Sequence, residues 1–112
     1  MDFNKQKPIY LQIADSLCEQ IVAGQWAPDE RIPSVRDLAA DMGVNPNTVM
    51  RAFDHLQGLQ IIYNKRGVGY FTEADAREKI NSLHRRIFLE EEWPAVLQKM
   101  KLLGILPQEL LS

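Results

Sequence analysis

The 112-residue sequence predicts a mainly α-helical fold with a small β-hairpin. Three observations support this fold class. Apolar residues recur at helical spacing in three consecutive segments between residues 9 and 57. Two short segments rich in β-branched and aromatic residues, 61–63 and 70–72, then flank a turn that contains two glycines. Helical spacing resumes at residue 75, so we expect further helices towards the C-terminus.

Length and composition restrict the class of protein. A chain of this length with 46% hydrophobic residues suits one compact domain, or a small domain with an appendage. The formal net charge of -2 counts mildly against binding to nucleic acid, although local charge patches decide such binding. The single cysteine, Cys18, permits no intrachain disulfide and fits a cytoplasmic location. Apolar runs are too short to cross a bilayer and no secretory signal precedes them, so we expect no membrane association.

The first helix is expected from Ile9 to Val22, after a polar and loose segment at residues 1–7. Pro8 suits a first helical turn, and Gly24 suits a helix end. Residues 25–33 are expected to form a loop that includes a very short strand at 31–33. The apolar stripe of the helix consists of Ile9, Ile13, Leu17 and Ile21.

A second and a third helix are expected next, close together. Ser34 is the N-cap of the second helix, and Asp37 supports the cap from the third helical position. Gly43 ends this helix, because glycine readily adopts the left-handed conformation that follows a helix. Asn45 is the N-cap of the third helix and Pro46 its first residue. A connection of about three residues with a glycine is typical of a helix-turn-helix.

The third helix, predicted to end near residue 56 or 57, carries two different faces. Asn and Arg pair bidentately with adenine and guanine edges, and a capped helix start offers free N–H groups to phosphate. The outward face therefore suits a DNA major groove. The alternative is an ordinary capped amphipathic helix with a solvated polar face. At about 100° per residue, the inward face holds Val49, Ala52, Phe53 and Leu56, and the outward face holds Asn47, Arg51 and Asp54.

Helix-turn-helix and hairpin together predict a winged helix-turn-helix. At the hairpin tip, Lys65, Arg66 and Gly67 would reach the neighbouring DNA backbone or minor groove, because glycine permits close approach. We expect the two cations of the tip to share one side of the molecule with Arg36 and Arg51. Few phosphate contacts in one copy imply weak binding, which a dimer would strengthen.

Three motifs carry a resemblance to a known family: PSVRDLA at 33–39, GVNPNTV at 43–49 and KRGVG at 65–69. With them, the chain from Lys7 to Phe71 resembles the GntR family of bacterial transcription regulators. The NPNTV string and the short tail resemble the YtrA-like subfamily in particular. The resemblance implies a regulator, most simply a repressor, that binds an inverted-repeat operator as a homodimer. It also implies DNA contacts by Arg36, Thr48 and Gly67.

The sequence departs from the pattern of this family at three positions. Met50 stands where many relatives carry a DNA-contacting arginine, and the neighbouring Arg51 is the expected substitute. Asp29 replaces a common glycine, which an aspartate tolerates in a turn. Gln60 also stands in place of a glycine, and Gly58 is expected to end the third helix in its stead.

We expect a winged helix-turn-helix DNA-binding domain at residues 1–74 and a helical dimerisation tail at 75–112. Asp54, on the DNA side, either stays clear of DNA or pairs with Arg51. The predicted DNA-binding residues are Ser34, Arg36, Asn45, Asn47, Thr48, Arg51, Lys65, Arg66 and Gly67.

The tail is expected to form two helices that Pro94 separates, followed by a frayed end. Its first apolar stripe is narrow, which suits pairing of helices across a two-fold axis. The alternative is that both helices pack only on their own DNA-binding domain. The predicted dimerisation residues are Ala76, Ile80, Leu83, Ile87, Val96, Met100 and Leu103.

We find no pattern of an enzyme in the sequence. His55 and His84 lack the neighbours of a metal site or catalytic triad, and no nucleophile–base pair or cofactor motif is present. We therefore expect no enzymatic activity, no cofactor, no metal and no obvious pocket for a small-molecule effector. The remaining alternative to a DNA-binding regulator is a winged helix that binds protein and not DNA.

Overall fold

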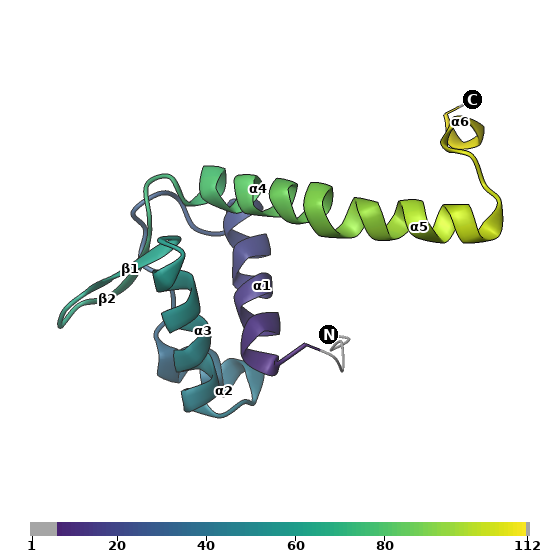
Figure 1. Cartoon of the computed structure of the whole chain (residues 1–112). Helices are drawn as coiled ribbons and strands as arrows, with labels where there is room; N and C mark the ends of the chain where they lie inside the picture. Colours follow the sequence, from purple (N-terminus) through teal and green to yellow (C-terminus); the bar gives the residue numbers. More distant parts are fainter. Residues whose placement is uncertain (1–6, 112) are drawn as a thin grey trace. The chain divides into compact units, whose positions relative to one another are not determined.

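The computed structural model describes residues 7–111. Three helices, a two-stranded hairpin and a second helical region follow one another along the chain (Figure 1). They form two compact units, one that ends at Ile80 and one that begins at Asn81. We call these units the head (residues 7–80) and the tail (residues 81–111). The predicted loose segment at 1–7 lies outside the described residues except for Lys7, and the domain boundary after residue 74 stays a prediction.

Helix α1 (Ile9–Val22) has the predicted bounds. Most of its predicted apolar stripe is buried, although Ile9 in the first turn is half exposed. Gly24 follows the helix with a φ of 88°. The N–H of Gln25 donates to the carbonyl of Gln20 at 2.9 Å, which closes the helix in the manner of a Schellman motif.

Helix α2 (Val35–Met42) begins and ends as predicted. The Oγ of Ser34 accepts a hydrogen bond from the N–H of Asp37 at 3.1 Å, so the serine is a true N-cap. Gly43 ends the helix in the left-handed region with a φ of 68°. The turn into the next helix is short, and the helix-turn-helix is therefore confirmed.

Helix α3 (Pro46–Gly58) starts at the predicted residue and ends later than predicted. Gly58 is its last residue, and the left-handed conformation falls instead on Gln60, with a φ of 60°. The N–H of Ile61 donates to the carbonyl of Leu56 at 3.0 Å, and both side chains are buried. Burial of these two side chains fixes the Schellman geometry, which places the left-handed residue two positions beyond the glycine.

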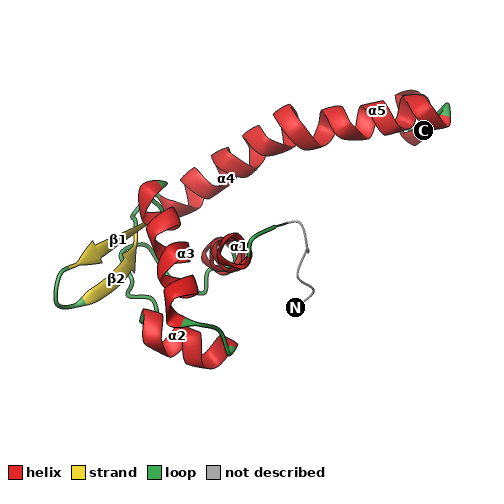
Figure 2. Ribbon diagram, turned by 60° about the horizontal axis from the view of Figure 1, so that its bottom comes forward, coloured by secondary structure: helices red, strands yellow, loops and turns green. Residues whose placement is uncertain are grey.

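The hairpin consists of β1 (Ile62–Lys65) and β2 (Gly69–Thr72), which pair antiparallel (Figure 2). Both views show it projecting beyond the three helices of the head. The predicted short strand at 31–33 is reduced to one bridge between Arg31 and Phe71. At the tip, the N–H of Val68 donates to the carbonyl of Lys65 at 2.9 Å.

The core of the head joins the helices to the base of the hairpin. Thr72 is the one buried polar side chain in the described part of the chain. Its hydroxyl donates to the carbonyl of Ala27 at 2.6 Å and accepts from the N–H of Glu30 at 3.3 Å, so the hairpin is tied to the loop that follows α1. The largest fully buried apolar side chains of the head are Phe53, Ile13, Leu17, Leu56, Ile61, Ile62, Ile80 and Val49.

Pro94 was predicted to separate two helices of the tail, and this prediction is wrong, because the helical backbone continues through it. The backbone passes from α4 (Ala76–Ile87) through a π-helical turn, η1 (Phe88–Glu92), into α5 (Trp93–Leu103). The N–H of Trp93 donates to the carbonyl of Phe88, five residues back. A proline has no N–H to donate and clashes with the carbonyl four residues before it, so the wider turn accommodates Pro94 without a break. The end of the chain, predicted to fray, forms a short helix, α6 (Pro107–Leu110).

Two of the predicted dimerisation residues are not available for dimerisation. Ala76 and Ile80 are 3% and 0% exposed and belong to the core of the head. The regular apolar spacing revealed a buried face, but that face is covered by the residues of the head itself. Leu83 and Ile87 are half-buried, Met100 is buried, and Val96 and Leu103 are exposed.

Candidate nucleic-acid interface

The start of α3 presents a polar surface. The Oδ1 of Asn45 accepts from the N–H of Asn47 at 2.8 Å, so the side chain of Asn45 is engaged as the helix cap. The side chain of Asn47 is exposed, and that of Thr48 is half-buried. This end of the helix therefore offers a carboxamide, a hydroxyl and the positive end of the helix dipole at one place.

Arg51 is exposed, as predicted, but it is held on one side of α3. Its guanidinium lies 4.2 Å from the ring centroid of Tyr10 on α1, and that ring meets the ring of His55 edge-on. A cation stacked on an aromatic ring keeps its charge and loses part of its freedom. Of the two alternatives for Asp54, the pair with Arg51 is not formed, because these two residues share no ion pair within residues 7–111.

The first turn of α2 adds one further cation. Arg36 is exposed, and its guanidinium takes part in no hydrogen bond or ion pair within the described residues. Ser34 caps the same helix as an acceptor, so its hydroxyl proton remains available to a phosphate oxygen. These two residues offer hydrogen-bond donors of the kind that position a protein on DNA by binding phosphate.

The two faces of the hairpin have different neighbours. Tyr70 packs edge-on against Phe53 of α3 with ring centroids 4.8 Å apart, and its hydroxyl lies 3.8 Å from the Sδ of Met50. Alternate residues of a strand point to opposite faces, so Tyr70 defines the face directed towards α3. The ammonium of Lys65 lies 4.8 Å from the ring centroid of Phe71, on the other face. Lys65 therefore does not share a surface with α3, contrary to our expectation.

Two of the predicted DNA-binding residues at the hairpin tip are accessible. Arg66 and Gly67 are exposed, and the guanidinium of Arg66 has no hydrogen bond or ion pair within residues 7–111. Gly67 has a φ of 78°, which a type II turn requires at its third position. The tip thus presents a free cation next to a residue without a side chain.

Two residues near this surface were missed by the sequence analysis. The first is Tyr70, whose hydroxyl connects the hairpin to the exposed face of α3. The second is Arg31, whose Nε lies 2.7 Å from the place where a Cβ on Gly69 would stand. A side chain at position 69 would force this guanidinium to move from its place against the strand. The alternation of the predicted strands could have revealed Tyr70, and the predicted short strand at 31–33 could have revealed Arg31.

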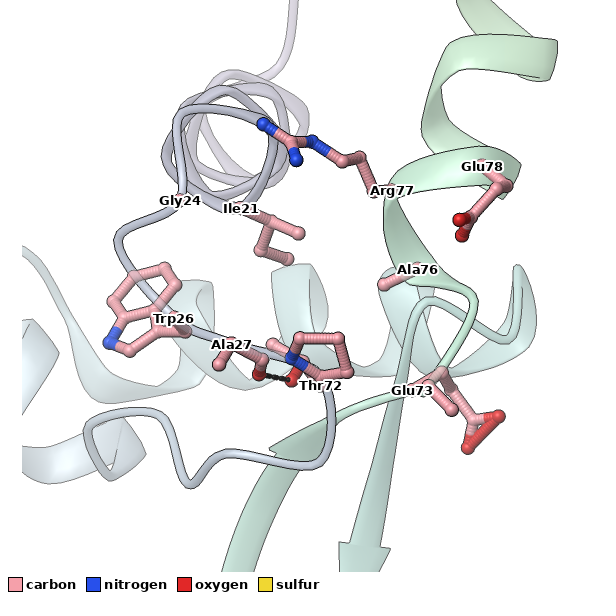
Figure 3. A pocket seen from close by; sticks show the side chains of 11 residues that line it. Ile21, Gly24, Trp26, Ala27, Thr72, Glu73, Ala76, Arg77 and Glu78 are labelled. Carbon is pink, nitrogen blue, oxygen red and sulfur yellow. Dashed lines mark hydrogen bonds between the residues drawn. The ribbon is translucent and has the colours of Figure 1, made fainter.

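A pocket of about 330 Å³ lies in the head, contrary to the expectation of no obvious pocket (Figure 3). It opens between the end of α1, the loop after it and the first turn of α4, and Trp26 forms one wall. Two of its polar side chains are already engaged: the hydroxyl of Thr72 donates to the carbonyl of Ala27, and Arg77 donates to the carbonyl of Val22 at 2.6 Å. The pocket is at the small end of the range for ligand sites.

Two other classes of site are absent from the described residues. No group of three or more His, Cys, Asp or Glu side chains between residues 7 and 111 is arranged to hold a metal ion. None of the helices in that range combines the length and the hydropathy that crossing a bilayer requires.

A short helix-turn-helix, a capped helix with an exposed polar face and a cationic hairpin tip define a winged-helix DNA-binding domain. The chain belongs to the GntR family: residues 9–72 match the model of bacterial regulatory proteins of the gntR family. It is 36% identical over 110 residues to the HTH-type transcriptional regulator YhcF of Bacillus subtilis, covering 98% of this chain and 89% of YhcF. It is also 36% identical over 77 residues to the transcriptional repressor YtrA of the same organism, covering 69% of this chain and 59% of YtrA.

Two solved structures are also similar to this chain. A GntR-family transcriptional regulator from Bacteroides thetaiotaomicron is 45% identical, with a TM-score of 0.79 over 91% of this chain and 88% of that one. The DNA-binding domain of AraR in complex with its operator ORR3 is 26% identical, with a TM-score of 0.58 over 64% of this chain and 87% of that one. The predicted family, fold class and role in DNA-binding transcription regulation are confirmed. The family is one of regulators and not of enzymes.

Proposed function

We propose that the chain is a transcriptional repressor in the bacterial cytoplasm that binds an inverted-repeat operator as a homodimer. The observation that carries the DNA-binding part is the exposed polar start of α3, together with the exposed guanidinium groups of Arg36 and Arg66, which have no partner within residues 7–111. A relative is a repressor and a structural neighbour is bound to its operator, which supports the same role here. Occlusion of a promoter needs only occupancy of the operator, so the proposal requires no further activity.

In this proposal each head contributes three kinds of contact. Asn47 and Thr48 at the start of α3 read base edges in the major groove, because the helix presents them on its exposed polar face. Arg36 and Arg66 bind phosphates on either side, and Arg51 acts from its position on Tyr10 as a backbone contact. Gly67 lets the tip approach the DNA closely.

The tail supports the homodimer through its exposed apolar side chains. Monomeric soluble proteins rarely expose a large contiguous apolar surface, so side chains of this number and size favour a partner. Of the predicted dimerisation residues outside the head core, Val96 and Leu103 are exposed, Leu83 and Ile87 are half-buried and Met100 is buried. The other exposed large apolar side chains of the tail are Phe88, Leu89, Trp93, Leu102, Leu106, Leu110 and Leu111.

The DNA-binding proposal is tested by selecting duplexes from a random pool and titrating the bound duplex with salt. We expect two half-sites at one fixed spacing, and an affinity that falls steeply as the salt concentration rises. Arg36→Ala or Arg66→Ala should lower the slope of log affinity against log salt by about 0.9 for each head, or about 1.8 for a dimer. Arg85→Ala is the matched control, since Arg85 is an exposed cation of the tail. Absence of salt-sensitive duplex binding would favour the alternative of a protein-binding winged helix.

The homodimer is tested separately by sedimentation of the free protein. Val96 and Leu103 lie seven residues apart on one side of α5, so Val96→Glu with Leu103→Glu places two charges on the proposed interface. We expect this variant to be monomeric and to bind the operator more weakly, with the melting temperature of the head unchanged. Lys101→Glu alters charge on another side of α5 and should leave the dimer intact. A wild-type protein that sediments as a monomer while bound to DNA would contradict the dimer.

A further inference from the structure

Met50 is the one large apolar side chain of α3 that is exposed. It is 39% exposed, whereas Val49, Ala52, Phe53 and Leu56 of the same helix are at most 1% exposed. It stands in the first half of the helix, between the polar residues Asn47 and Arg51 in sequence. An isolated exposed methionine is ordinary on a protein surface, so its position and its contacts decide whether it has a role.

The contacts of Met50 hold it in place. The hydroxyl of Tyr70 donates to its Sδ at 3.8 Å, and the ring of Tyr70 packs against Phe53 at 4.8 Å between centroids. Phe53 is 0% exposed, so this chain of contacts fixes the thioether to the core of the head. The sulfur is directed to the hairpin, and the residue as a whole stays 39% exposed.

The neighbouring cation does not compete for the same place. The guanidinium of Arg51 lies on Tyr10 of α1, whereas Met50 lies against Tyr70 of the hairpin. These two side chains therefore project about 100° apart around α3 and contact different neighbours. On the hairpin side, the group that α3 offers to a base edge is apolar, and a thioether makes no strong hydrogen bond.

We propose that Met50 contacts the 5-methyl group of a thymine in the major groove and so selects thymine at one position of each half-site. Among the four bases only thymine carries a methyl group in the major groove, and apolar side chains recognise it. The polarisable thioether of methionine adapts well to such a contact. This inference rests on the proposed function, since it names the base that the proposed DNA-binding surface recognises.

The test uses the full chain and the duplex that selection yields. Each thymine of the half-site is replaced in turn by deoxyuridine, which removes the 5-methyl group and keeps the pairing edge. We expect one position at which this replacement weakens binding about fourfold, the value for one buried methyl group, and about fifteenfold when both half-sites are replaced. Met50→Ala should bind thymine and deoxyuridine duplexes equally at that position, and Met50→Leu should retain the difference.

Tyr70→Phe tests whether the hydroxyl positions Met50. It removes the hydrogen bond to Sδ and leaves the ring on Phe53, so we expect a smaller methyl preference with an unchanged salt slope. Circular dichroism melting of each variant confirms that the head is folded. Deoxyuridine without effect at every thymine, or an equal effect in the wild type and in Met50→Ala, would overturn the inference while leaving DNA binding intact. Failure of the proposed function would appear differently, as the loss of salt-sensitive binding to any duplex.

Discussion

The head and the tail use apolar side chains in opposite ways. In the head, α1, α3 and the hairpin base bury theirs, and Phe53 and Ile80 are both 0% exposed. In the tail, Met100 is the one buried apolar side chain among residues 81–111, while Leu102 and Leu103 are 77% and 62% exposed. Burial of apolar side chains therefore stabilises the head from within, whereas the tail exposes apolar side chains that a second surface can cover.

The largest expected difference between the two regions is in thiol reactivity. Burial, followed by the charges of Asp15 and Glu19, raises the pKa of the Cys18 thiol to about 12. At pH 8 a thiol with this pKa has about a thousandfold less thiolate than one with a pKa of 9.0, so alkylation by iodoacetamide should be slower by about that factor. Ser82→Cys places a second thiol in the exposed part of α4 for comparison within one molecule.

Mass spectrometry over time measures both labelling rates, and equal labelling of the two thiols would contradict the expected difference.

The raised pKa of the Cys18 thiol also makes the stability of the head depend on pH. The folded pKa lies above the unfolded one, so the contribution of Cys18 is complete below pH 9.0 and is lost as the pH rises to about 12.

The next largest effect is expected for truncation of a core side chain. Ile80→Ala should lower the free energy of unfolding by about 2–5 kcal/mol, because it removes buried methylene groups and leaves a cavity. Leu103→Ala should change it by less than about 0.5 kcal/mol at concentrations where the protein is monomeric. Urea unfolding followed by circular dichroism gives both values. Similar losses in the two variants would show that the tail also has a core of its own.

A smaller effect is expected at the connection between hairpin and loop. Thr72→Val removes two hydrogen bonds of the hydroxyl, so the carbonyl of Ala27 and the N–H of Glu30 keep only their bond to each other at 3.1 Å, at a cost of about 1–3 kcal/mol for the two lost bonds. Thr48→Val is the control, because that hydroxyl makes no hydrogen bond within residues 7–111. Urea unfolding should separate the two variants by at least about 1 kcal/mol. Equal stabilities would mean that the buried hydroxyl does not hold the hairpin.

The smallest effect is a gain in stability. Gln60 has a φ of 60°, which costs a residue with a Cβ more than it costs glycine. Gln60→Gly should therefore raise the free energy of unfolding by about 0.5–1 kcal/mol. Gln57→Gly is the same substitution inside α3, where it should lower that energy by up to about 1 kcal/mol. Changes of the same sign in both variants would contradict the role of the left-handed conformation.

Local features of the fold were predictable from the sequence. The caps at Ser34 and Asn45, the glycine at 43 and the turn between α2 and α3 depend on neighbouring residues, and all were predicted correctly. The end of α3 was not predicted correctly, because it depends on the burial of Leu56 and Ile61 and the nearby glycine does not determine it. A local signal is reliable where no distant contact competes with it.

The site was predictable in outline only. Helical geometry correctly placed Asn47 and Arg51 on the exposed side of α3. The stacking of Arg51 on Tyr10 joins residues far apart in sequence, so no spacing rule could reveal it. Likewise, the apolar spacing at Ala76 and Ile80 indicated that these residues are buried. It did not indicate which surface covers them.

The π-helical turn at Phe88–Glu92 has a geometric consequence for the tail. A turn of this kind holds one residue more than an α-helical turn, and each residue of a helix advances about 100° around the axis. Deleting one residue from it would therefore restore an α-helical turn and leave Val96 and Leu103 on nearly the same side of the helix relative to Leu83 and Ile87. The wider turn thus absorbs one additional residue while the apolar residues of α5 stay in phase with those that precede it in the tail.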